Sequence, residues 1–445
     1  MAIQSIKLKP GINREGTRYT TEGGYYDGDK IRFRQGTPEK IGGWTQISTS
    51  TFEGVCRSLH NWVTLGGQNL IGVGTHLKFY ISNVGNYNDV TPIRATVSLS
   101  NPFTTVSGSA VVTVTDANGG YQDGDYVTFS NASAVGGLTI DGEFVVSLSV
   151  TTAANSYNIT ASSNATSSAT GGGTVSAAYQ INVGNPFAVP IEGWGASSWG
   201  SGAWNVGESS TTAIRFFSQS NFGEDLIFGN NGGSIFYWDA TGSVTTRAVL
   251  LSTLSGASDV PVVQNLILVS DISRFVFCFG TNEIGSNTID PTLLRWSDQE
   301  DATNWTPSAT NQAGSLRLSR GTKIVAASQA RQEVLVWTDS SLYSLQYVGA
   351  PAVWAATLVG ENISISSQNA VAYANGVAYW MGKDKFYMYD GRTQPLKCDV
   401  RKYIFNDFNT AQYSQVFSGT NESFHEVWWF YCSDGETNID KYVIY

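Results

Sequence analysis

The chain has 445 residues with a formal net charge of −10, 14% charged and 12% aromatic side chains, and 47 glycines. This length accommodates one large repeat domain with an insertion, or two to three ordinary domains, and the acidic balance argues against a general nucleic-acid binder, which neutralises phosphates with Lys and Arg. A surface of Ser, Thr, Asn and Gly with few ions is typical of short strands joined by turns, so the composition favours an all-β protein.

Residues 1–54 are predicted to form a basic N-terminal arm and the first strands of the propeller described below. Residues 1–40 carry eight basic side chains against five acidic ones, which predicts docking to an acidic surface. The opening MAIQSIKLKPGINREG lacks the hydrophobic stretch of a secretion signal, and no apolar run approaches about 18 residues. We therefore expect a product made in the cytoplasm without membrane insertion. Residues 31–47 (IRFRQGTPEKIGGWTQI) predict two strands that complete a sheet or close a ring.

Residues 55–92 form the first of several similar units. This unit contains LIGVGTHLKFYI, which predicts a strand, a tight turn and a second strand. Alternation of apolar residues with period two on both sides of a Gly, Asn, Asp or Ser turn is typical of a β-hairpin. The segment therefore predicts a blade of a β-propeller.

Residues 93–192 differ abruptly from the units on either side. Only seven side chains in this window are charged, and it contains no Trp. Segments such as AVVTVTDANGGYQDGDYVTFS and GEFVVSLSV still alternate like strands, so they can bury one face of a sheet. The window predicts an inserted small β-sandwich or barrel that protrudes from the main body, with residues 161–173 as a long flexible turn.

A Gly-rich bridge at 193–212 carries Trp194, Trp199 and Trp204. A spacing of five fits neither one strand face nor a helix stripe, so each indole is predicted to be an independent anchor. Three roles remain open for these anchors: packing on their own domain, a subunit contact, or stacking on a sugar.

Hairpin units resume after the bridge and continue to the last residue. Examples are LIFGNNGGSIFYWDATG from Leu226, VLVWTDSSLYSLQYVG from Val334 and EVWWFYCSDGETNIDKYVIY from Glu426. The spacing of about 40 residues is that of propeller blades. With 55–92, the ranges 213–249, 262–306, 320–359, 368–398 and 412–445 predict an all-β fold, a β-propeller of about six blades.

The sequence offers little for catalysis or for a metal. His60, His76 and His425 have no metal-binding partners at a suitable spacing, and the cysteines are predicted to be buried free thiols: Cys56, Cys278, Cys398 and Cys432. The stretch Asp116 to Asp125 has hard oxygen ligands, but Val127 stands where a calcium loop needs Glu. A tight turn is the better interpretation there, and we predict no catalytic, cofactor-binding or metal-binding residues.

The segment SDQEDATNW (297–305) resembles the Asp-box turn of sialidases, but Gln299 and Asp301 stand where that turn has Asp and Gly. Asp298, Glu300 and Asp301 therefore predict a solvated acidic turn, and an acidic channel wall is the functional alternative.

The arm also carries a resemblance. The order of Pro10 to Arg14, then Arg32 and Phe33, Gly36 to Lys40 and Gly42 to Trp44 resembles the start of tail hub proteins of short-tailed bacteriophages, also called nozzle or packaged-DNA stabilisation proteins. The bridge from Gly193 and the stretch LRWSDQEDATNWTP (294–307) are similar too. The likeness spans nearly the whole chain except the insert, and it depends on the order of these motifs.

The resemblance implies a structural virion protein, made in the host cytoplasm, that assembles as a homo-oligomeric ring, commonly of six. Such a ring extends the DNA exit channel below the portal-adaptor ring, helps retain the packaged genome, and carries fibres, spikes or a plug, without enzymatic activity or a cofactor. DNA would pass through it without sequence recognition. The expected contacts to the adaptor or to a neighbouring subunit are Lys7, Lys9, Arg14, Arg18, Arg32, Arg34, Trp194, Trp199 and Trp204.

An acidic wall that lacks lysine from residue 79 to 322 would repel phosphates and let DNA slide. Two alternatives remain. A carbohydrate-binding or depolymerising propeller at the virion surface predicts an open pocket with paired carboxylates and aromatic rings. A bacterial adhesin or periplasmic propeller needs a signal peptide that the sequence does not show.

Overall fold

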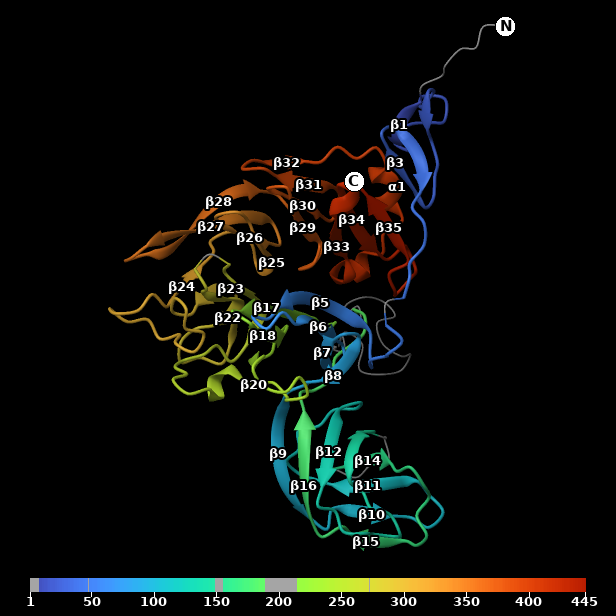
Figure 1. Cartoon of the computed structure of the whole chain (residues 1–445), viewed down its shortest axis with the longest axis vertical. Helices are drawn as coiled ribbons and strands as arrows, with labels where there is room; N and C mark the ends of the chain where they lie inside the picture. Colours follow the sequence, from blue (N-terminus) through green and yellow to red (C-terminus); the bar gives the residue numbers. More distant parts are fainter. Residues whose placement is uncertain (1–7, 47, 149–154, 189–213, 272) are drawn as a thin grey trace, which may run out of the picture.

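The computed structural model describes residues 8–46, 48–148, 155–188, 214–271 and 273–445. These residues form an N-terminal arm, a β-propeller and an inserted β-sandwich (Figure 1). One α-helix occurs among them, α1 (Arg401–Asn406), with three short 3-10 helices, η1 (Leu251–Thr253), η2 (Thr410–Gln415) and η3 (Glu422–Phe424). The predicted all-β class is confirmed.

Six antiparallel sheets form the blades, and each pairs its strands in chain order. Blade 1 is β5 (Cys56–Val63), β6 (Asn69–Thr75), β7 (Phe79–Asn83) and β8 (Asn86–Asp89). Blade 2 is β17 (Phe217–Phe222), β18 (Asp225–Asn230), β19 (Ile235–Trp238) and β20 (Val249–Leu250). Blade 3 is β21 (Gln264–Val269), β22 (Val276–Asn282), β23 (Ile289–Trp296) and β24 (Gly314–Arg317). Blade 4 is β25 (Ile324–Gln329), β26 (Val334–Thr338), β27 (Ser341–Gly349) and β28 (Val353–Glu361).

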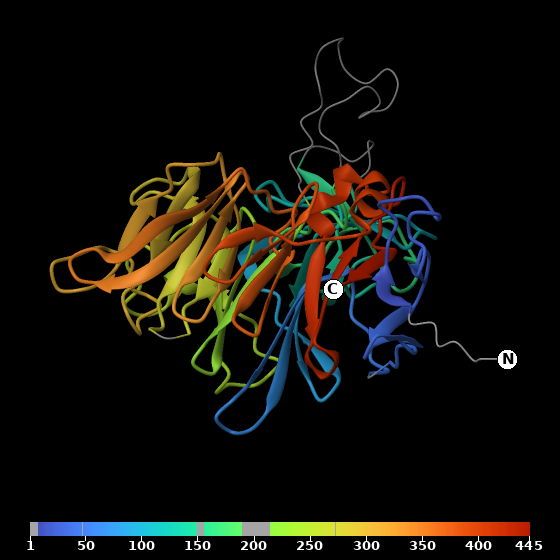
Figure 2. The same cartoon turned by 90° about the horizontal axis from the view of Figure 1, so that it is seen from above.

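Blade 5 is β29 (Val371–Ala374), β30 (Val377–Met381), β31 (Phe386–Tyr389) and β32 (Thr393–Pro395). Blade 6 has three strands, β33 (Phe417–Asn421), β34 (Glu426–Tyr431) and β35 (Lys441–Ile444). The blades follow one another around the disc, as Figures 1 and 2 show from two directions. The predicted number of blades is therefore confirmed. The range expected for blade 3, 262–306, stops before β24, because a long turn separates β24 from the Trp-ended β23.

Aromatic and aliphatic side chains fill the spaces between neighbouring blades. Every residue of β22 is buried, as expected for a central strand that is covered on both faces. Ring contacts between blades join Phe79 to Phe228 (3.8 Å between centroids), Phe277 to Trp354 (4.9 Å), Trp337 to Trp380 (5.3 Å) and Phe386 to Trp429 (4.9 Å). Each blade thus depends on its neighbours for a core.

In the described residues, the boundary between blade 1 and the last two blades is polar. The Asn369 side chain donates to the Arg57 carbonyl at 3.3 Å. Nearby, the Gln412 side chain donates to the carbonyl of Ala188, in the segment that follows the insert, at 2.8 Å and accepts from the Ala188 amide at 3.1 Å. We call this boundary the polar seam, because side-chain amide groups make its contacts, whereas apolar side chains fill the other boundaries.

The insert is a sandwich of two four-stranded sheets, which confirms the first of the two folds expected for it. One sheet has the order β14 (Ser156–Thr160), β11 (Val111–Thr115), β10 (Phe103–Thr105), β15 (Ala169–Gly171). The other has the order β13 (Gly142–Val145), β12 (Tyr126–Ser130), β16 (Thr174–Gln180), β9 (Ile93–Ser100). The flexible turn expected at 161–173 is partly wrong, because β15 lies inside it and pairs with β10.

The arm contains β1 (Lys9–Ile12) paired with β2 (Gly24–Tyr25), and β3 (Ile31–Arg34) paired with β4 (Thr37–Lys40). The β3–β4 hairpin is a two-stranded sheet of its own. The expectation that these strands complete a blade or close the ring is therefore wrong for the described residues. The hairpin lies instead beside blade 6 and α1 (Figure 1).

Candidate functional site

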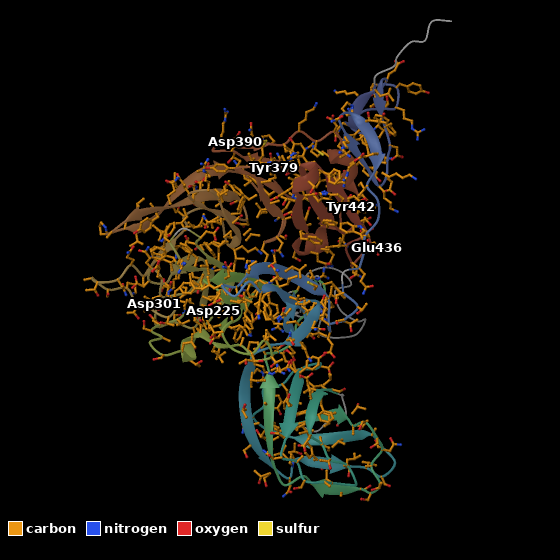
Figure 3. The ribbon with its side chains drawn as sticks, viewed as in Figure 1. Asp225, Asp301, Tyr379, Asp390, Glu436 and Tyr442 are labelled. Atoms are coloured by element: carbon orange, nitrogen blue, oxygen red, sulfur yellow. The ribbon has the colours of Figure 1, made fainter. Side chains whose placement is uncertain are left out.

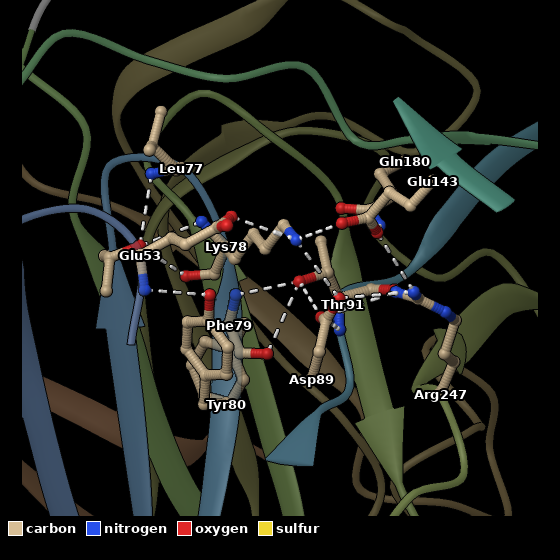
Figure 4. A network of polar contacts seen from close by, with 11 residues as sticks. Glu53, Leu77, Lys78, Phe79, Tyr80, Asp89, Thr91, Glu143, Gln180 and Arg247 are labelled. Carbon is tan, nitrogen blue, oxygen red and sulfur yellow. Dashed lines mark hydrogen bonds and ion pairs between the residues drawn. The ribbon is translucent and has the colours of Figure 1, made fainter. Parts of the chain in front are cut away.

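A cluster of charged side chains lies where the insert meets the propeller (Figure 4). We call it the junction network, and its members come from blades 1 and 2, their flanking loops and the insert: Glu53, Lys78, Asp89, Glu143, Gln180 and Arg247.

Lys78 occupies the centre of the junction network. Only 5% of the surface of Lys78 is exposed to solvent. Its ammonium group contacts Glu143 of the insert and lies 3.1 Å from Glu53 and 3.7 Å from Asp89. It also lies 4.1 Å from the centre of the Tyr126 ring. Burial alone would lower the pKa of Lys78, but its bond to Glu143 and the nearby carboxylates raise the pKa above the ordinary value.

Arg247 provides a second cation from blade 2. Its guanidinium lies 3.2 Å from Asp89 and 3.7 Å from Glu143, and it donates to the Thr91 carbonyl at 2.7 Å. Glu143 is therefore bound by cations from two blades. Since a lone buried charge is costly, this pairing fixes the position at which the insert meets the disc.

A second charged contact joins the insert to the strand that re-enters the propeller. Asp125, in an insert turn, is fully buried and accepts the Gln122 and Val183 amides. Arg94 lies 3.8 Å from this carboxylate, and the buried Arg215 donates to the Asn182 carbonyl. Burial raises the pKa of Asp125, and burial lowers the pKa of Arg215 to about 10. Arg94 and Asp125 both belong to the insert, so Arg215, which precedes β17, is the residue that links this cluster to the propeller.

These junction residues were not predicted from the sequence, although a signal was present. Lys78 is the last lysine before residue 323 and stands inside the apolar run LKFYI, while Glu143 and Asp125 are among the few charges of the insert. A rare charge in a neutral, strand-forming segment indicates a buried partner. The sequence alone does not say which partner.

The structure separates the predicted basic residues of the arm into two groups. Arg32 is buried, lies 3.1 Å from Glu426 of β34 and covers the Phe424 ring. Arg14 pairs with Asp27 at 2.6 Å and stacks on Tyr403 of α1. Lys9, Arg18 and Arg34 are exposed. Arg32 and Arg14 thus anchor the arm within the chain, and the docking role of the exposed residues stays a prediction.

Four of the predicted contact residues, Lys7, Trp194, Trp199 and Trp204, lie outside the described residues.

The acidic turn at 298–301 is a compact loop between β23 and β24. Asp298 accepts the Gln312 amide at 2.8 Å, and Asp301 accepts both the amide and the hydroxyl of Thr303. Glu300 is exposed. These bonds support the solvated-turn interpretation, whereas a role in a channel wall stays a prediction.

Glu300 and Asp301 also line a pocket of about 510 Å³ on one face of the propeller, together with Glu224, Asp225 and Tyr237. Figure 3 shows Asp225 and Asp301 near each other on this part of the disc. Asp225 is already bound, because it accepts the Tyr237 hydroxyl and the Ala240 amide. Arg274 is the cation in the lining.

The remaining polar candidates have structural roles in the described residues. Asp116 accepts the Asn118 amide at 2.9 Å, as tight-turn chemistry predicts, and also the Tyr179 hydroxyl at 2.6 Å; Asp123 accepts the Leu148 amide at 2.7 Å. His60 lies 3.2 Å from Asn221, and His76 accepts the Val55 amide. All four cysteines are free; Cys278 and Cys432 are buried and the other two are half-buried. Within the described ranges, no cluster of three His, Cys, Asp or Glu residues could hold a metal.

No protein-family model matches the chain, and no curated protein matches it. Among solved structures, the chain is similar to the phage phi92 endosialidase, with 11% identity, a TM-score of 0.22 and coverage of 89% of this chain and 55% of that one. It is also similar to Kluyvelomyces marxianus Hsv2, with 7% identity, a TM-score of 0.27 and coverage of 51% and 64%. The chain spans about half the length of the endosialidase. TM-scores this low establish neither a shared fold nor a shared activity.

Across the described part of the chain, the helices are too short to span a bilayer.

Lys78→Met tests the junction network. We expect it to lower the free energy of unfolding by about 3 kcal/mol, because it leaves three carboxylates around one cation. Small-angle scattering should also show a wider spread of insert positions. Lys397→Met, at a lysine that is 81% exposed in its side chain, is the matched control and should change neither quantity. Equal behaviour of the Lys78 and Lys397 variants would contradict the assignment.

The junction network should also depend on pH. Because the pKa of Lys78 is raised, the contact should persist through neutral pH and weaken only above about pH 10.

Arg32→Glu tests the arm anchor. It places a carboxylate against Glu426, so we expect a loss of about 3 kcal/mol or more and faster proteolytic cleavage between arm and propeller. Arg34→Glu, at an exposed neighbour on the same strand, should leave the cleavage rate unchanged. An arm that stays equally protected in both variants would show that the Arg32 pair does not hold it.

Proposed function

We propose that this chain is a structural protein of a bacteriophage tail, a ring-forming hub or nozzle below the portal-adaptor ring. In this role it extends the DNA exit channel, helps retain the packaged genome and provides a platform for fibres or a plug. It acts by assembly and has no chemistry of its own. It would be made in the host cytoplasm and function in the virion.

The observation that carries the proposal is the arm. The segment whose motifs resemble tail hub proteins, Pro10 to Trp44, folds outside the blades and is fixed to blade 6 through Arg32 and Glu426. Its outward side chains remain uncovered: Lys9, Arg18, Arg34, Lys40 and Trp44, the last 82% exposed. A firmly anchored module with exposed cations and an exposed indole suits a surface for binding another protein.

The two charged contacts of the insert are consistent with the same role. A module that carries fibres or a plug needs a fixed direction. The junction network joins Glu143 of the insert to blades 1 and 2, and Arg215 bonds the Asn182 carbonyl where the chain leaves the insert. Flexible Gly or Ser linkers would allow the insert to swing instead.

Assembly with the portal-adaptor ring is the direct test. We expect purified protein mixed with phage adaptor rings to form a complex of defined mass, measured by light scattering after gel filtration. Lys9→Glu with Arg18→Glu should weaken this complex and leave the melting temperature within about 2 °C, because both side chains are exposed. Arg392→Glu, an exposed charge reversal on blade 5, is the control. A protein that ignores adaptor rings would contradict the proposal.

The acidic pocket favours a second candidate, a carbohydrate-binding propeller at the virion surface. Carboxylates beside Tyr237 in an open hollow are what that alternative predicts. If it holds, the chain should bind oligosaccharides in calorimetric titrations, and Glu300→Gln should weaken the binding about tenfold, whereas Glu283→Gln outside the pocket should not. No binding to a broad glycan panel would exclude this candidate.

A further inference from the structure

The β27–β28 hairpin extends beyond the rim of the propeller (Figures 1 and 2). Each strand has nine residues, the longest in the described chain, and the residues at the turn are exposed. No charged residue lies between Asp339 and Glu361. Exposed strand ends are usually protected by Lys or other charges, so an uncharged, projecting hairpin indicates a surface that is covered by a partner.

The hairpin tip is joined to the acidic turn by a chain of hydrogen bonds. The Tyr347 hydroxyl donates to the Gln312 side chain at 2.9 Å, the Gln312 side chain donates to Gln299 at 3.0 Å, and the Gln312 amide donates to Asp298. Tyr347 also packs on Phe275 and Trp354, which gives the tip a rigid base. We call this combined region the tip surface: Tyr347, Val348, Ala350, Pro351, Ala352 and the turn 298–301.

The arm lies at the opposite edge of the disc from this hairpin (Figures 1 and 2). Its outward side chains are Trp44, Tyr19, which is 92% exposed, and the cations Lys9, Arg18, Arg34 and Lys40. We call this the arm surface. The tip surface has apolar side chains beside Asp298, Glu300 and Asp301, with Arg274 nearby. The arm surface has aromatic rings beside cations. The two are complementary in charge and in apolar character.

We propose that the tip surface of one copy docks on the arm surface of a second copy. One chain cannot join its own two surfaces, because they lie across the disc from each other. A contact between two different patches repeats in one direction and gives a ring if the rotation closes. This inference deepens the proposed function and rests on it for the ring, since it names the subunit contact that such a ring would use.

Mixing two complementary variants tests the contact with the full chain. The tip variant is Val348→Glu, and the arm variant is Arg34→Glu with Lys40→Glu. The wild type should show masses above the monomer that rise with concentration, and each variant alone should lose about thirtyfold or more in association affinity. An equimolar mixture should form a two-chain species and stop there, because one intact tip and one intact arm remain per pair.

Two control variants and three contradicting results complete this test. Val111→Glu, an exposed valine on the insert, and Arg392→Glu, on blade 5, should associate like the wild type. If Val348→Glu does not fold, Glu300→Lys is the alternative tip variant. A monomeric wild type, a variant that associates normally, or a mixture that stays monomeric would each overturn the proposal. Adaptor binding by the wild type in any of these cases would leave the proposed function standing, which separates the two failures.

Discussion

Apolar packing between neighbouring blades is the interaction on which this fold depends. A single four-stranded sheet of this size cannot bury both faces, so each blade completes its core against the next. Rings meet at four of these boundaries, from Phe79 on Phe228 to Phe386 on Trp429, and aliphatic side chains such as Ile227 and Ile267 share a buried cluster between blades 2 and 3. The polar seam between blade 1 and the last blades is the exception, where the Asn369 side chain bonds the Arg57 carbonyl. Hydrogen bonds of side-chain amides contribute less free energy to stability than buried aromatic area. We therefore expect the ring to open first at the polar seam.

Charges have a different role in this chain, since two of the buried ions lie where separately folded parts meet. Lys78 with Glu143 joins the insert to blade 1, while Arg32 with Glu426 joins the arm to blade 6. A buried ion pair adds little net stability over an apolar pair, but it penalises every arrangement in which the partners separate. The blades supply the stability, and these few ions fix the directions of the arm and the insert.

The sequence predicted the parts of the structure that depend on local patterns. Hairpins with alternating apolar residues gave the class, the number of blades and the position of the insert. Predictions failed where distant partners decide the outcome: β15 forms within a Ser- and Gly-rich segment because β10 provides its partner, and β24 lies beyond a long turn. The β3–β4 hairpin looked like a propeller strand pair, yet Arg32 binds it to Glu426 as a separate module. Lys78 and Glu143 lie far apart in the sequence, so their spacing does not indicate that they form a pair.

The arm surface and the tip surface also differ in how much of each the sequence predicted. The exposed cations of the arm were found from charge alone, whereas the burial of Arg32 was not, because Arg32 and Arg34 are equivalent in a strand pattern until the blade beside them is known. The uncharged β27–β28 tip was also missed as a surface, since its alternation matches that of every other hairpin and only its length and position make it project.

Electron cryomicroscopy of assembled phage particles tests the central claim most directly. The account predicts that this chain forms a closed ring beneath the portal-adaptor ring, with each β27–β28 hairpin seated on the arm of the next copy and the DNA passage at the ring centre. Single copies at the tips of fibres with a sugar in the acidic pocket, or no copies in the tail, would contradict it.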